Sequence, residues 1–232
     1  AAMRRANIAV LLSGHGFGVA PYKVLRTSED AASVDPALLP GIVKSARLGY
    51  DGKGQIRVSS VAGIGAAFAR MGGVPCVLER FVDLACEVSV IVARDDSGAS
   101  ITWPVAENRH RDGILDVSIA PARVDDALAE RARGNATGVA RALDYRGVLC
   151  VEMFVTRGGE ILVNEMAPRP HNSGHYTIDA CATSQFEQQA RVLAGLPLGD
   201  TMQHTPAVMV NVLGDVWFDG PQATAPRDPD WT

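Results

Sequence analysis

Hydrophobic and polar residues alternate in several short runs along the chain, which is the spacing of strands with one buried face. Fewer segments show apolar residues at helical spacing, and most of these end at Gly or Pro. We therefore predict helices over 28–39 (weak), 61–71, 125–143 and 184–194, and strands over 22–26, 41–46, 55–59, 75–79, 87–94, 100–105, 114–120, 147–155, 160–164 and 208–212.

Short turns join neighbouring strands and predict antiparallel hairpins. The segment 95–98 links two predicted strands, and 156–159 links two more. The chain lacks the regular strand–helix alternation of a doubly wound sheet, a G-x-G-x-x-G after a strand, and a G-x-x-x-x-G-K-[ST] loop. We expect an α+β (mixed α/β) fold and exclude the Rossmann and P-loop classes.

Composition narrows the class further. The 232 residues are 47% hydrophobic and carry a formal net charge of −4, which is typical of a folded soluble protein and argues against nucleic-acid binding. No apolar run approaches the roughly 18 residues of a membrane helix. The widely spaced Cys76, Cys86, Cys150 and Cys181 show no metal-binding spacing, and we expect reduced core thiols in a cytoplasmic protein.

Lys44 lies inside a predicted strand and is followed by the glycine-rich segment 49–55, GYDGKGQ. Glycines leave backbone N–H groups free to approach a ligand closely, so the segment could close over phosphates. A plain β-hairpin turn explains the same residues equally well.

Two acids, Glu152 and Glu165, occur in otherwise apolar predicted strands. If the hairpin turn closes at 156–159, Glu152 pairs with Val163 and Glu165 lies diagonally across on the same face, roughly 7–8 Å away. Paired carboxylates with Asn164 nearby would suit Mg²⁺, which prefers oxygen ligands. The alternative is a pair of acids on a solvated face.

The segment 168–175, PRPHNSGH, gathers a cation, two imidazoles, an amide and a hydroxyl directly after Glu165. This density beside a candidate metal site favours a substrate pocket. Glu79 and Glu87 flank a possible hinge, where the Glu79 backbone could meet an adenine. His110, taken alone, indicates only a surface loop.

These segments together resemble the ATP-grasp superfamily. The pieces that carry the resemblance are GYDGKGQ at 49–55, HRDGIL at 110–115, VEMFV at 151–155 and NEMAPRPHNSGHYT at 164–177. The last is long and unusual, and within the superfamily it is similar to the 5-(carboxyamino)imidazole ribonucleotide synthases of purine biosynthesis. The resemblance runs from residue 18 to about residue 214.

The resemblance implies two α+β subdomains that grip ATP, at 21–78 and 79–214, preceded by the exit segment of another domain at 1–20 and followed by a loose tail at 215–232. It implies an ATP-dependent carbon–nitrogen ligase that uses Mg²⁺ and joins bicarbonate to 5-aminoimidazole ribonucleotide through carboxyphosphate, forming ADP and phosphate. A homodimer is also common in this family.

The resemblance also implies site residues. For ATP they are Lys44 at the phosphates, the covering loop of Gly49, Tyr50, Asp51, Gly52, Lys53, Gly54 and Gln55, the adenine contacts Glu79, Arg80, Phe81 and Val82, and Glu87, His110, Asn164 and Glu165. Glu152 and Glu165 would bind Mg²⁺. The bicarbonate and ribonucleotide side would hold Tyr50, Asp51, Arg169, His171, Asn172 and Ser173. The base that deprotonates the substrate amine is either Asp51 or His171.

The chain departs from the family pattern at both ends. The family's N-terminal nucleotide-fold domain and its C-terminal β domain with a G-R-K-x-G-H segment find no match, and Leu48 stands where a glycine is frequent. We expect the ATP-grasp core of such a synthase. The alternatives are an ATP-binding fragment without complete catalysis and a ligase for another acid and amine.

Overall fold

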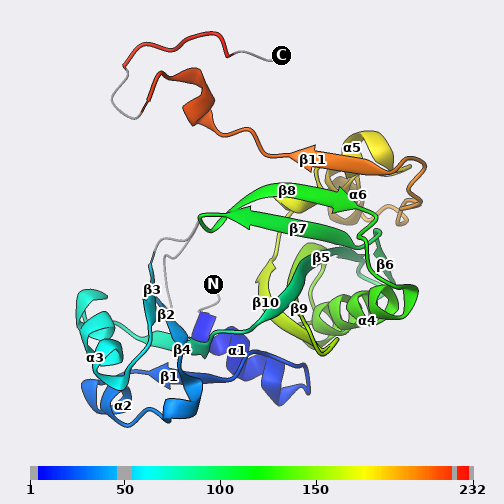
Figure 1. The fold of residues 1–232 in the computed structure, drawn as a ribbon. Coiled ribbons are helices and arrows are strands. Elements are labelled where there is room, and N and C mark those ends of the chain that lie inside the picture. The colour runs from blue at the N-terminus through cyan, green and yellow to red at the C-terminus, as the bar shows by residue number, and fades with distance from the viewer. Residues whose placement is uncertain (1–4, 46–53, 221–223, 230–232) are drawn as a thin grey trace.

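Two antiparallel sheets form the framework of the computed structural model, which describes residues 5–45, 54–220 and 224–229. The four-stranded sheet has the order β1-β4-β2-β3, and the seven-stranded sheet has the order β10-β9-β5-β7-β8-β11, with β6 paired to β5. Helix α1 contacts β4 of the first sheet and β10 of the second, so it lies between them (Figure 1).

The four-stranded sheet and its helices occupy the first third of the chain. The helices α2 and α3 pack on one face over Leu25, Val43 and Leu78, leaving the other face toward the second sheet. The elements are α1 (Arg5–Gly14), β1 (Tyr22–Leu25), α2 (Ser28–Ala32), η1 (Pro36–Leu38), β2 (Gly41–Ser45), β3 (Gln55–Val58), α3 (Val61–Arg70) and β4 (Cys76–Arg80).

The seven-stranded sheet is built from the rest of the chain and is covered on both faces. Its elements are β5 (Leu84–Arg94), β6 (Ser100–Thr102), β7 (Ala106–Arg111), β8 (Ile114–Ala120), α4 (Asp126–Ala142), β9 (Gly147–Thr156), β10 (Ile161–Ala167), η2 (Asn172–Gly174), α5 (Thr177–Ala180), α6 (Gln185–Leu193), β11 (Ala207–Val210) and η3 (Gly214–Trp217). Beyond β11 the described chain runs away from the sheet (Figure 1).

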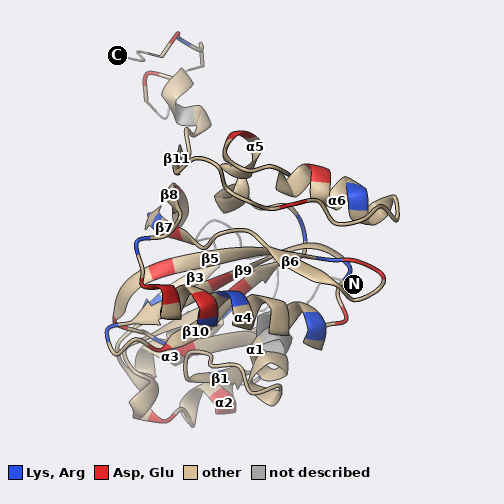
Figure 2. Cartoon of the chain, turned by 90° about the vertical axis from the view of Figure 1, so that its right-hand side faces the viewer, with Lys and Arg blue, Asp and Glu red and all other residues tan. Residues whose placement is uncertain are grey.

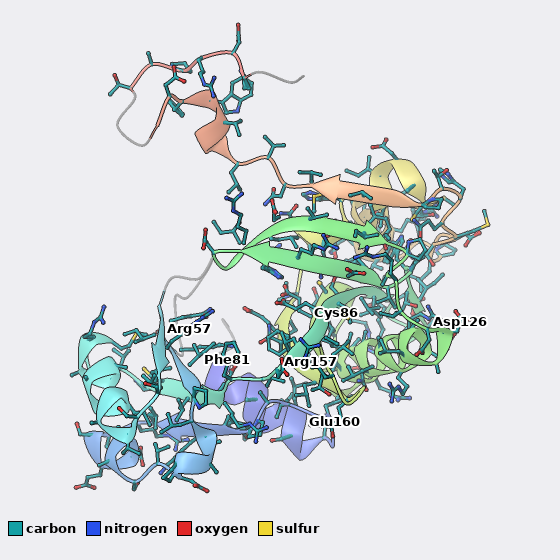
Figure 3. The ribbon with its side chains drawn as sticks, in the orientation of Figure 1. Arg57, Phe81, Cys86, Asp126, Arg157 and Glu160 are labelled. Atoms are coloured by element: carbon teal, nitrogen blue, oxygen red, sulfur yellow. The ribbon has the colours of Figure 1, made fainter. Side chains whose placement is uncertain are left out.

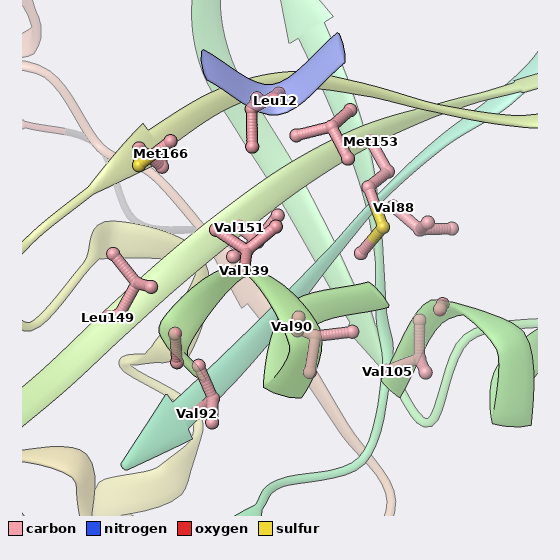
Figure 4. Close-up of a cluster of buried hydrophobic side chains, with 14 of the residues drawn as sticks. Leu12, Val88, Val90, Val92, Val105, Val139, Leu149, Val151, Met153 and Met166 are labelled. Atoms are coloured by element: carbon pink, nitrogen blue, oxygen red, sulfur yellow. The ribbon is translucent and has the colours of Figure 1, made fainter. Parts of the chain in front are cut away.

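Helix α4 covers one face of the large sheet. Asp125 starts the helix by accepting a hydrogen bond from the Leu128 N–H at 2.7 Å. Its apolar side packs on every second residue of the central strands, and Leu12 of α1 joins the same cluster (Figure 4). The cluster includes Val88, Val90, Val92, Val139, Leu149, Val151 and Met153.

Because side chains alternate across a strand, the intervening residues point to the opposite face. There Ile91, Trp103 and Val148 form a second core with Tyr176 and Ala180 from the α5 region. This second face also carries the polar residues of the candidate site. The sheet is therefore apolar on its α4 face and mixed on the other.

Two of the differences between the prediction and the structure have a clear local reason. The helix expected over 28–39 is split into α2 and η1, because a capping box of Thr27 and Asp30 starts a short helix and Pro36 opens a separate 3-10 turn. The segment around His110, interpreted from sequence as a surface loop, is strand β7. Its residues were hard to recognise because polar side chains occupy both faces of the strand.

The β9–β10 register also corrects the sequence prediction. Thr156 pairs with Glu160 around a three-residue turn that ends in Gly159 at φ +79°, so Val163 lies opposite Met153. An irregularity between Val163 and Glu165 then sets Glu165 directly opposite Glu152. The two acids are cross-strand neighbours, closer in register than the diagonal arrangement expected.

In α4 and α6 the acidic residues come first along the helix and the arginines follow them (Figure 2). In the described part of the chain, no helix is both long and apolar enough to span a membrane. The four cysteines are free thiols, three of them buried and Cys86 half-buried.

Candidate functional site

A crevice lies where the four-stranded sheet faces the β10 edge of the large sheet. Lys44 and Glu79 come from the small sheet, and Asn164 and Glu165 come from β10. Apolar residues complete the lining, namely Ala9, Leu12, Val19, Ala20 and Val163. One cation and two types of oxygen donor therefore meet in a hollow with apolar walls, a common composition for a ligand site.

Lys44 and Glu79 are paired by the register of β2 and β4. Ile42 lies opposite Glu79 and Lys44 opposite Val77, which puts Lys44 and Glu79 on a diagonal of one sheet face. Their Nζ and Oε2 atoms are 2.5 Å apart, with 11% and 17% of the side chains exposed. The fold thus holds an ammonium group at the crevice, where it could meet an anionic ligand.

The hinge segment after β4 is fixed by its backbone. The Arg80 N–H donates to Pro21 O and the Phe81 N–H donates to Pro40 O, both at 2.8 Å. The exposed Phe81 ring lies under the Arg57 guanidinium, 5.4 Å from its carbon to the ring centroid (Figure 3). The Phe81 side chain therefore sits in a hollow with Arg57, Pro40 and Val58, apart from the crevice.

Beyond the crevice, the site continues along the second face of the large sheet. Residues at alternate positions of five strands share this face, as the strand period requires. They are Glu87 and Ser89 of β5, Asn108 and His110 of β7, Ser118 of β8, Cys150 and Glu152 of β9, and Glu165 of β10.

Glu87 and His110 form a pair on this face. The His110 Nδ1 lies 2.9 Å from Glu87 Oε2, and both side chains are about three-quarters buried. The hydrogen bond that His110 donates to Glu87 raises the pKa of His110, and burial opposes that rise. The structure therefore brings together two residues that are far apart in sequence and that were both predicted to lie near a nucleotide.

Glu152 and Glu165 offer oxygen ligands from adjacent strands. Like charges directly opposite each other are unfavourable in a sheet, and a divalent cation between them would remove that repulsion. Asn164, at the irregular position of β10, lines the crevice beside Glu165. This donor set, with its carboxylate and amide oxygens, fits Mg²⁺.

Glu152 also pairs with His171, whose Nε2 lies 3.0 Å from Glu152 Oε1. Burial lowers the pKa of His171, but its interactions with Cys150 and with the Glu152 carboxylate outweigh burial and raise the pKa to about 10. Burial raises the pKa of Glu152, and the hydrogen bond from His171 reverses this and lowers it. The pair is therefore an imidazolium and a carboxylate at neutral pH.

A buried chain of hydrogen bonds supports His171 from behind. Its Nδ1 lies 2.9 Å from Ser173 Oγ, and the Ser89 hydroxyl donates to the same oxygen at 2.8 Å. The Asn108 amide donates to Ser89 Oγ at 2.8 Å, and the Ser118 hydroxyl donates to Asn108 Oδ1 at 2.7 Å. The chain spans β5, β7 and β8, so one polar network fixes the position of the imidazole.

Gln185, the first residue of α6, holds the backbone of His171. The His171 N–H donates to Gln185 Oε1 at 2.8 Å, and Gln185 Nε2 donates to His171 O at 2.6 Å. The side chain is fully buried. Sequence reasoning missed Gln185. The available signal was a Gln that directly follows the helix cap Ser184, at a position facing the protein interior.

Sequence reasoning also missed Ser89, Asn108 and Ser118 and interpreted Cys150 only as a core thiol. For Cys150 the signal was its spacing, because a residue two positions before Glu152 on a strand shares its face. The serines and Asn108 gave no such signal, since their partners lie on other strands.

The remaining predicted site residues are exposed or half-buried, or they lie outside the described residues. Arg169 is exposed and its Nη1 donates to the Pro170 carbonyl at 2.9 Å, while the half-buried Asn172 opens η2. Gly54 directly precedes β3, and Gln55 is the first residue of β3 and lies opposite Lys44. Gly49, Tyr50, Asp51, Gly52 and Lys53 lie outside the described residues.

The chain is similar to a known protein family and to several proteins of that family. A protein-family profile described as an ATP-grasp domain matches residues 10–186. The N5-carboxyaminoimidazole ribonucleotide synthase of Bacillus subtilis is 48% identical over 201 residues, covering 86% of this chain and 53% of that protein. The synthase of Brucella melitensis is 49% identical over 207 residues, covering 88% and 57%. The chain spans about half the length of the curated relatives it matches.

Solved structures give the same result. An N5-carboxyaminoimidazole ribonucleotide synthetase in complex with ADP has a TM-score of 0.87 and 40% identity, covering 98% of this chain and 65% of that chain. The synthase of Aspergillus clavatus in complex with ADP and 5-aminoimidazole ribonucleotide has a TM-score of 0.83 and 32% identity, covering 91% and 57%. The predicted mixed helices and antiparallel sheets of an ATP-grasp fold are confirmed.

Proposed function

The chain belongs to the ATP-grasp family, and from this premise we propose that it binds ATP with Mg²⁺ and acts as the ATP-grasp part of an N5-carboxyaminoimidazole ribonucleotide synthase. The reaction joins bicarbonate to the amino group of 5-aminoimidazole ribonucleotide, and ATP becomes ADP and phosphate. One observation carries the proposal. Glu165, which lines the crevice with Lys44 and Glu79, lies directly opposite Glu152, and Glu152 pairs with His171 on the same sheet face.

We assign the crevice to the phosphates of ATP. The Lys44 ammonium would neutralise phosphate charge, with the described glycine Gly54 and the rest of the 49–55 loop covering it. Adenine would meet the backbone of 79–82 through the carbonyls of Arg80 and Phe81, because the N–H groups of both are used within the fold. Val82 completes that segment.

Glu87 and His110 would hold the ribose side of the nucleotide. Their mutual bond fixes both side chains before a ligand arrives, which lowers the ordering cost of binding. Glu152 and Glu165 would bind Mg²⁺, and Asn164 would contact the nucleotide beside them. The bound ion would supply positive charge to the transferred phosphoryl group.

The acceptor side lies around η2. Bicarbonate attacks the γ-phosphorus to give carboxyphosphate, and the substrate amine then attacks the carboxyphosphate carbon and releases phosphate. His171, held as an imidazolium by Glu152, would place its positive charge beside the bicarbonate or carboxyphosphate oxygens. A protonated His171 cannot take the amine proton, so we assign that role to Asp51. Tyr50, Arg169, Asn172 and Ser173 would line the same side.

The assay for this function measures ADP release with ATP, Mg²⁺ and bicarbonate, with and without 5-aminoimidazole ribonucleotide. We expect the ribonucleotide to stimulate ADP release. Retained ATP binding without stimulation would instead support an ATP-binding fragment that lacks complete catalysis. Stimulation by another amine, and not by this ribonucleotide, would indicate a ligase for a different substrate pair.

The metal assignment is tested separately by Glu165→Gln, which keeps the shape of the side chain and removes its charge. We expect Mg²⁺-dependent ATP affinity to fall by about tenfold or more, measured by calorimetry, because one of the two opposed carboxylates is lost. Glu160→Gln, at the exposed end of the same hairpin, is the control (Figure 3). Equal affinities of the Glu165 and Glu160 variants would refute the metal role.

Two further properties belong to the same proposal. A cytoplasmic location is supported by the four free cysteines, since disulfides are rare in reducing compartments. A homodimer is supported by the family resemblance alone, and sedimentation equilibrium of the purified chain measures it.

A further inference from the structure

One group of side chains joins a thiol that the proposed reaction does not use to two residues that it does use. Among the residues that the structure describes, Cys150, Glu152 and His171 each place one ligand atom within 4.8 Å of the other two. Cys150 and Glu152 are two positions apart on β9 and share a face, while His171 reaches them from the loop after β10. We call these three residues the thiol cluster.

The donor types in the thiol cluster differ from those that suit Mg²⁺. Magnesium prefers oxygen ligands, whereas a thiolate, an imidazole nitrogen and a carboxylate together are typical of Zn²⁺ sites with three protein ligands. From ordinary Zn–S and Zn–N bond lengths, tetrahedral ligands are about 3.4–3.6 Å apart. His171 Nε2 and Glu152 Oε1 are 3.0 Å apart and all three ligand atoms lie within 4.8 Å of one another, so small shifts of the three side chains bring the set to that spacing.

We propose that Cys150, Glu152 and His171 form a binding site for a thiophilic divalent cation of the Zn²⁺ class. The ion takes the place of the proton between His171 and Glu152. One proton leaves the Cys150 thiol and one leaves His171 Nε2, both to solvent, and no oxidation is involved. The fourth ligand position faces the partly exposed side of Glu152 and His171, where 18% and 13% of the side chains are accessible.

The surroundings of His171 support a ligand role for its Nε2. Metal-binding histidines usually hydrogen-bond through the other ring nitrogen, which orients the ring. Here Nδ1 is held by Ser173 Oγ at 2.9 Å, and Ser173 is fully buried and fixed in turn by Ser89. The Ser173 oxygen also lies 3.8 Å from Cys150 Sγ. The same hydroxyl therefore touches two of the three ligands and sets their positions.

The site shares Glu152 with the proposed Mg²⁺ pair but does not include Glu165. A thiophilic ion bound there would remove Glu152 from Mg²⁺ and His171 from the acceptor substrates. This consequence, which rests on the proposed function, is inhibition of the Mg²⁺-ATP reaction by Zn²⁺. Binding of the ion itself does not depend on that function.

The direct test is a Co²⁺ titration of the metal-free chain, followed by absorbance. Thiolate ligation gives a sulfur-to-cobalt charge-transfer band, and tetrahedral geometry gives intense visible bands. We expect both bands to saturate at one equivalent of Co²⁺ and to disappear in Cys150→Ser. Cys86→Ser is the matched control, because Cys86 is on β5 toward the opposite, α4 face of the sheet (Figure 3). An unchanged charge-transfer band in Cys150→Ser would overturn the proposal, as would its absence from the wild-type chain.

A second measurement covers the case in which a variant fails to fold. X-ray absorption of the wild-type chain loaded with one equivalent of Zn²⁺ should show one sulfur and several nitrogen or oxygen neighbours. A set of nearest neighbours without sulfur contradicts the site.

Ser173→Ala should weaken the affinity for Zn²⁺ by about tenfold in chelator competition, the usual effect of losing a partner of a metal-bound histidine. An unchanged affinity in Ser173→Ala would contradict the positioning of His171 by that hydroxyl.

The inhibitory consequence has its own experiment. We expect chain loaded with one Zn²⁺ and freed of excess ion to bind Mg²⁺-ADP at least tenfold more weakly than metal-free chain, and loaded Cys86→Ser to behave the same. A cobalt charge-transfer band together with unchanged Mg²⁺-ADP affinity would leave the thiol cluster as a metal site and count against Glu152 as a Mg²⁺ ligand. Failure of the new site and failure of the proposed function are thus distinguishable.

Discussion

The two sheets carry their functional groups in different ways. The four-stranded sheet is covered on one face by α2 and α3, and its open face presents Lys44 and Glu79 toward the crevice, each held mainly by the other. The seven-stranded sheet is covered on both faces, and its polar residues form a chain from Ser118 to Glu152 in which each group depends on the next.

This difference follows from burial. A polar side chain at an open face can be satisfied by water or ligand, whereas a polar side chain between two packed layers must find its partner within the protein. Changes in the large sheet should therefore cost stability, and changes in the small sheet should cost ligand affinity. The following three predictions test that contrast, from the largest expected effect to the smallest.

Gln185→Ala should destabilise the protein by about 3 kcal/mol. The substitution leaves the N–H and C=O of His171 without their buried partner and opens a cavity at a fully buried position. Urea unfolding followed by tryptophan fluorescence measures the change. The control on the same helix is Glu187→Ala, which removes an exposed ion pair with Arg191 and should cost less than about 1 kcal/mol. Equal costs for the two variants would mean that the amide of Gln185 does not support the loop.

Lys44→Met should lower ATP affinity by about tenfold or more, because the crevice loses its ammonium group next to the phosphates. The change in unfolding free energy should be smaller than for Gln185→Ala, since Glu79 keeps 17% of its side chain exposed whereas Gln185 is fully buried. Calorimetric titration with Mg²⁺-ATP gives the affinity. Lys23→Met is the matched control, since Lys23 lies in the same sheet but bonds to Ser33 O at 2.6 Å. If both lysine variants bind ATP equally well, the phosphates do not contact Lys44.

Wild type should lose stability as the pH falls, and Glu107→Gln should lose less of it. The difference in unfolding free energy should be less than about 1 kcal/mol. The hydrogen bond from Arg123 lowers the pKa of Glu107 below its usual 4.5. A lowered carboxyl pKa stabilises the fold fully above the unfolded value, and this contribution disappears as the pH falls through the folded value. The effect is small because the Arg123 side chain is 56% exposed. Unfolding in urea between pH 6 and pH 3 measures it, and identical curves for wild type and variant would contradict the shift.

Local patterns were sufficient for much of the fold. The helix from Asp125 and the β9 strand were predictable, because a cap, an apolar spacing or an alternation lies within one segment. The β7 strand was not, since its polar residues Glu107 and Asn108 are buried only because β5 and β8 lie on either side. The same reason explains the missed Asn108.

The same distinction between local patterns and contacts of distant segments applies to the candidate site. Glu152, Glu165 and His171 could be selected from the sequence because their motifs are compact. Their actual geometry could not, since a turn ending at Gly159 and an irregularity next to Asn164 each shift the register by one residue. Only together do they set the two acids opposite each other.

The sequence by itself determined the ATP-grasp membership, the mixed α and β character and the residue types of the site, because these depend on motifs and periods that are local in the chain. Only the tertiary structure decided which groups meet. It paired Lys44 with Glu79, linked His171 to Ser173 and brought Cys150 to the edge of the proposed metal pair. Those contacts depend on strand register and on packing between distant segments, which no local pattern encodes.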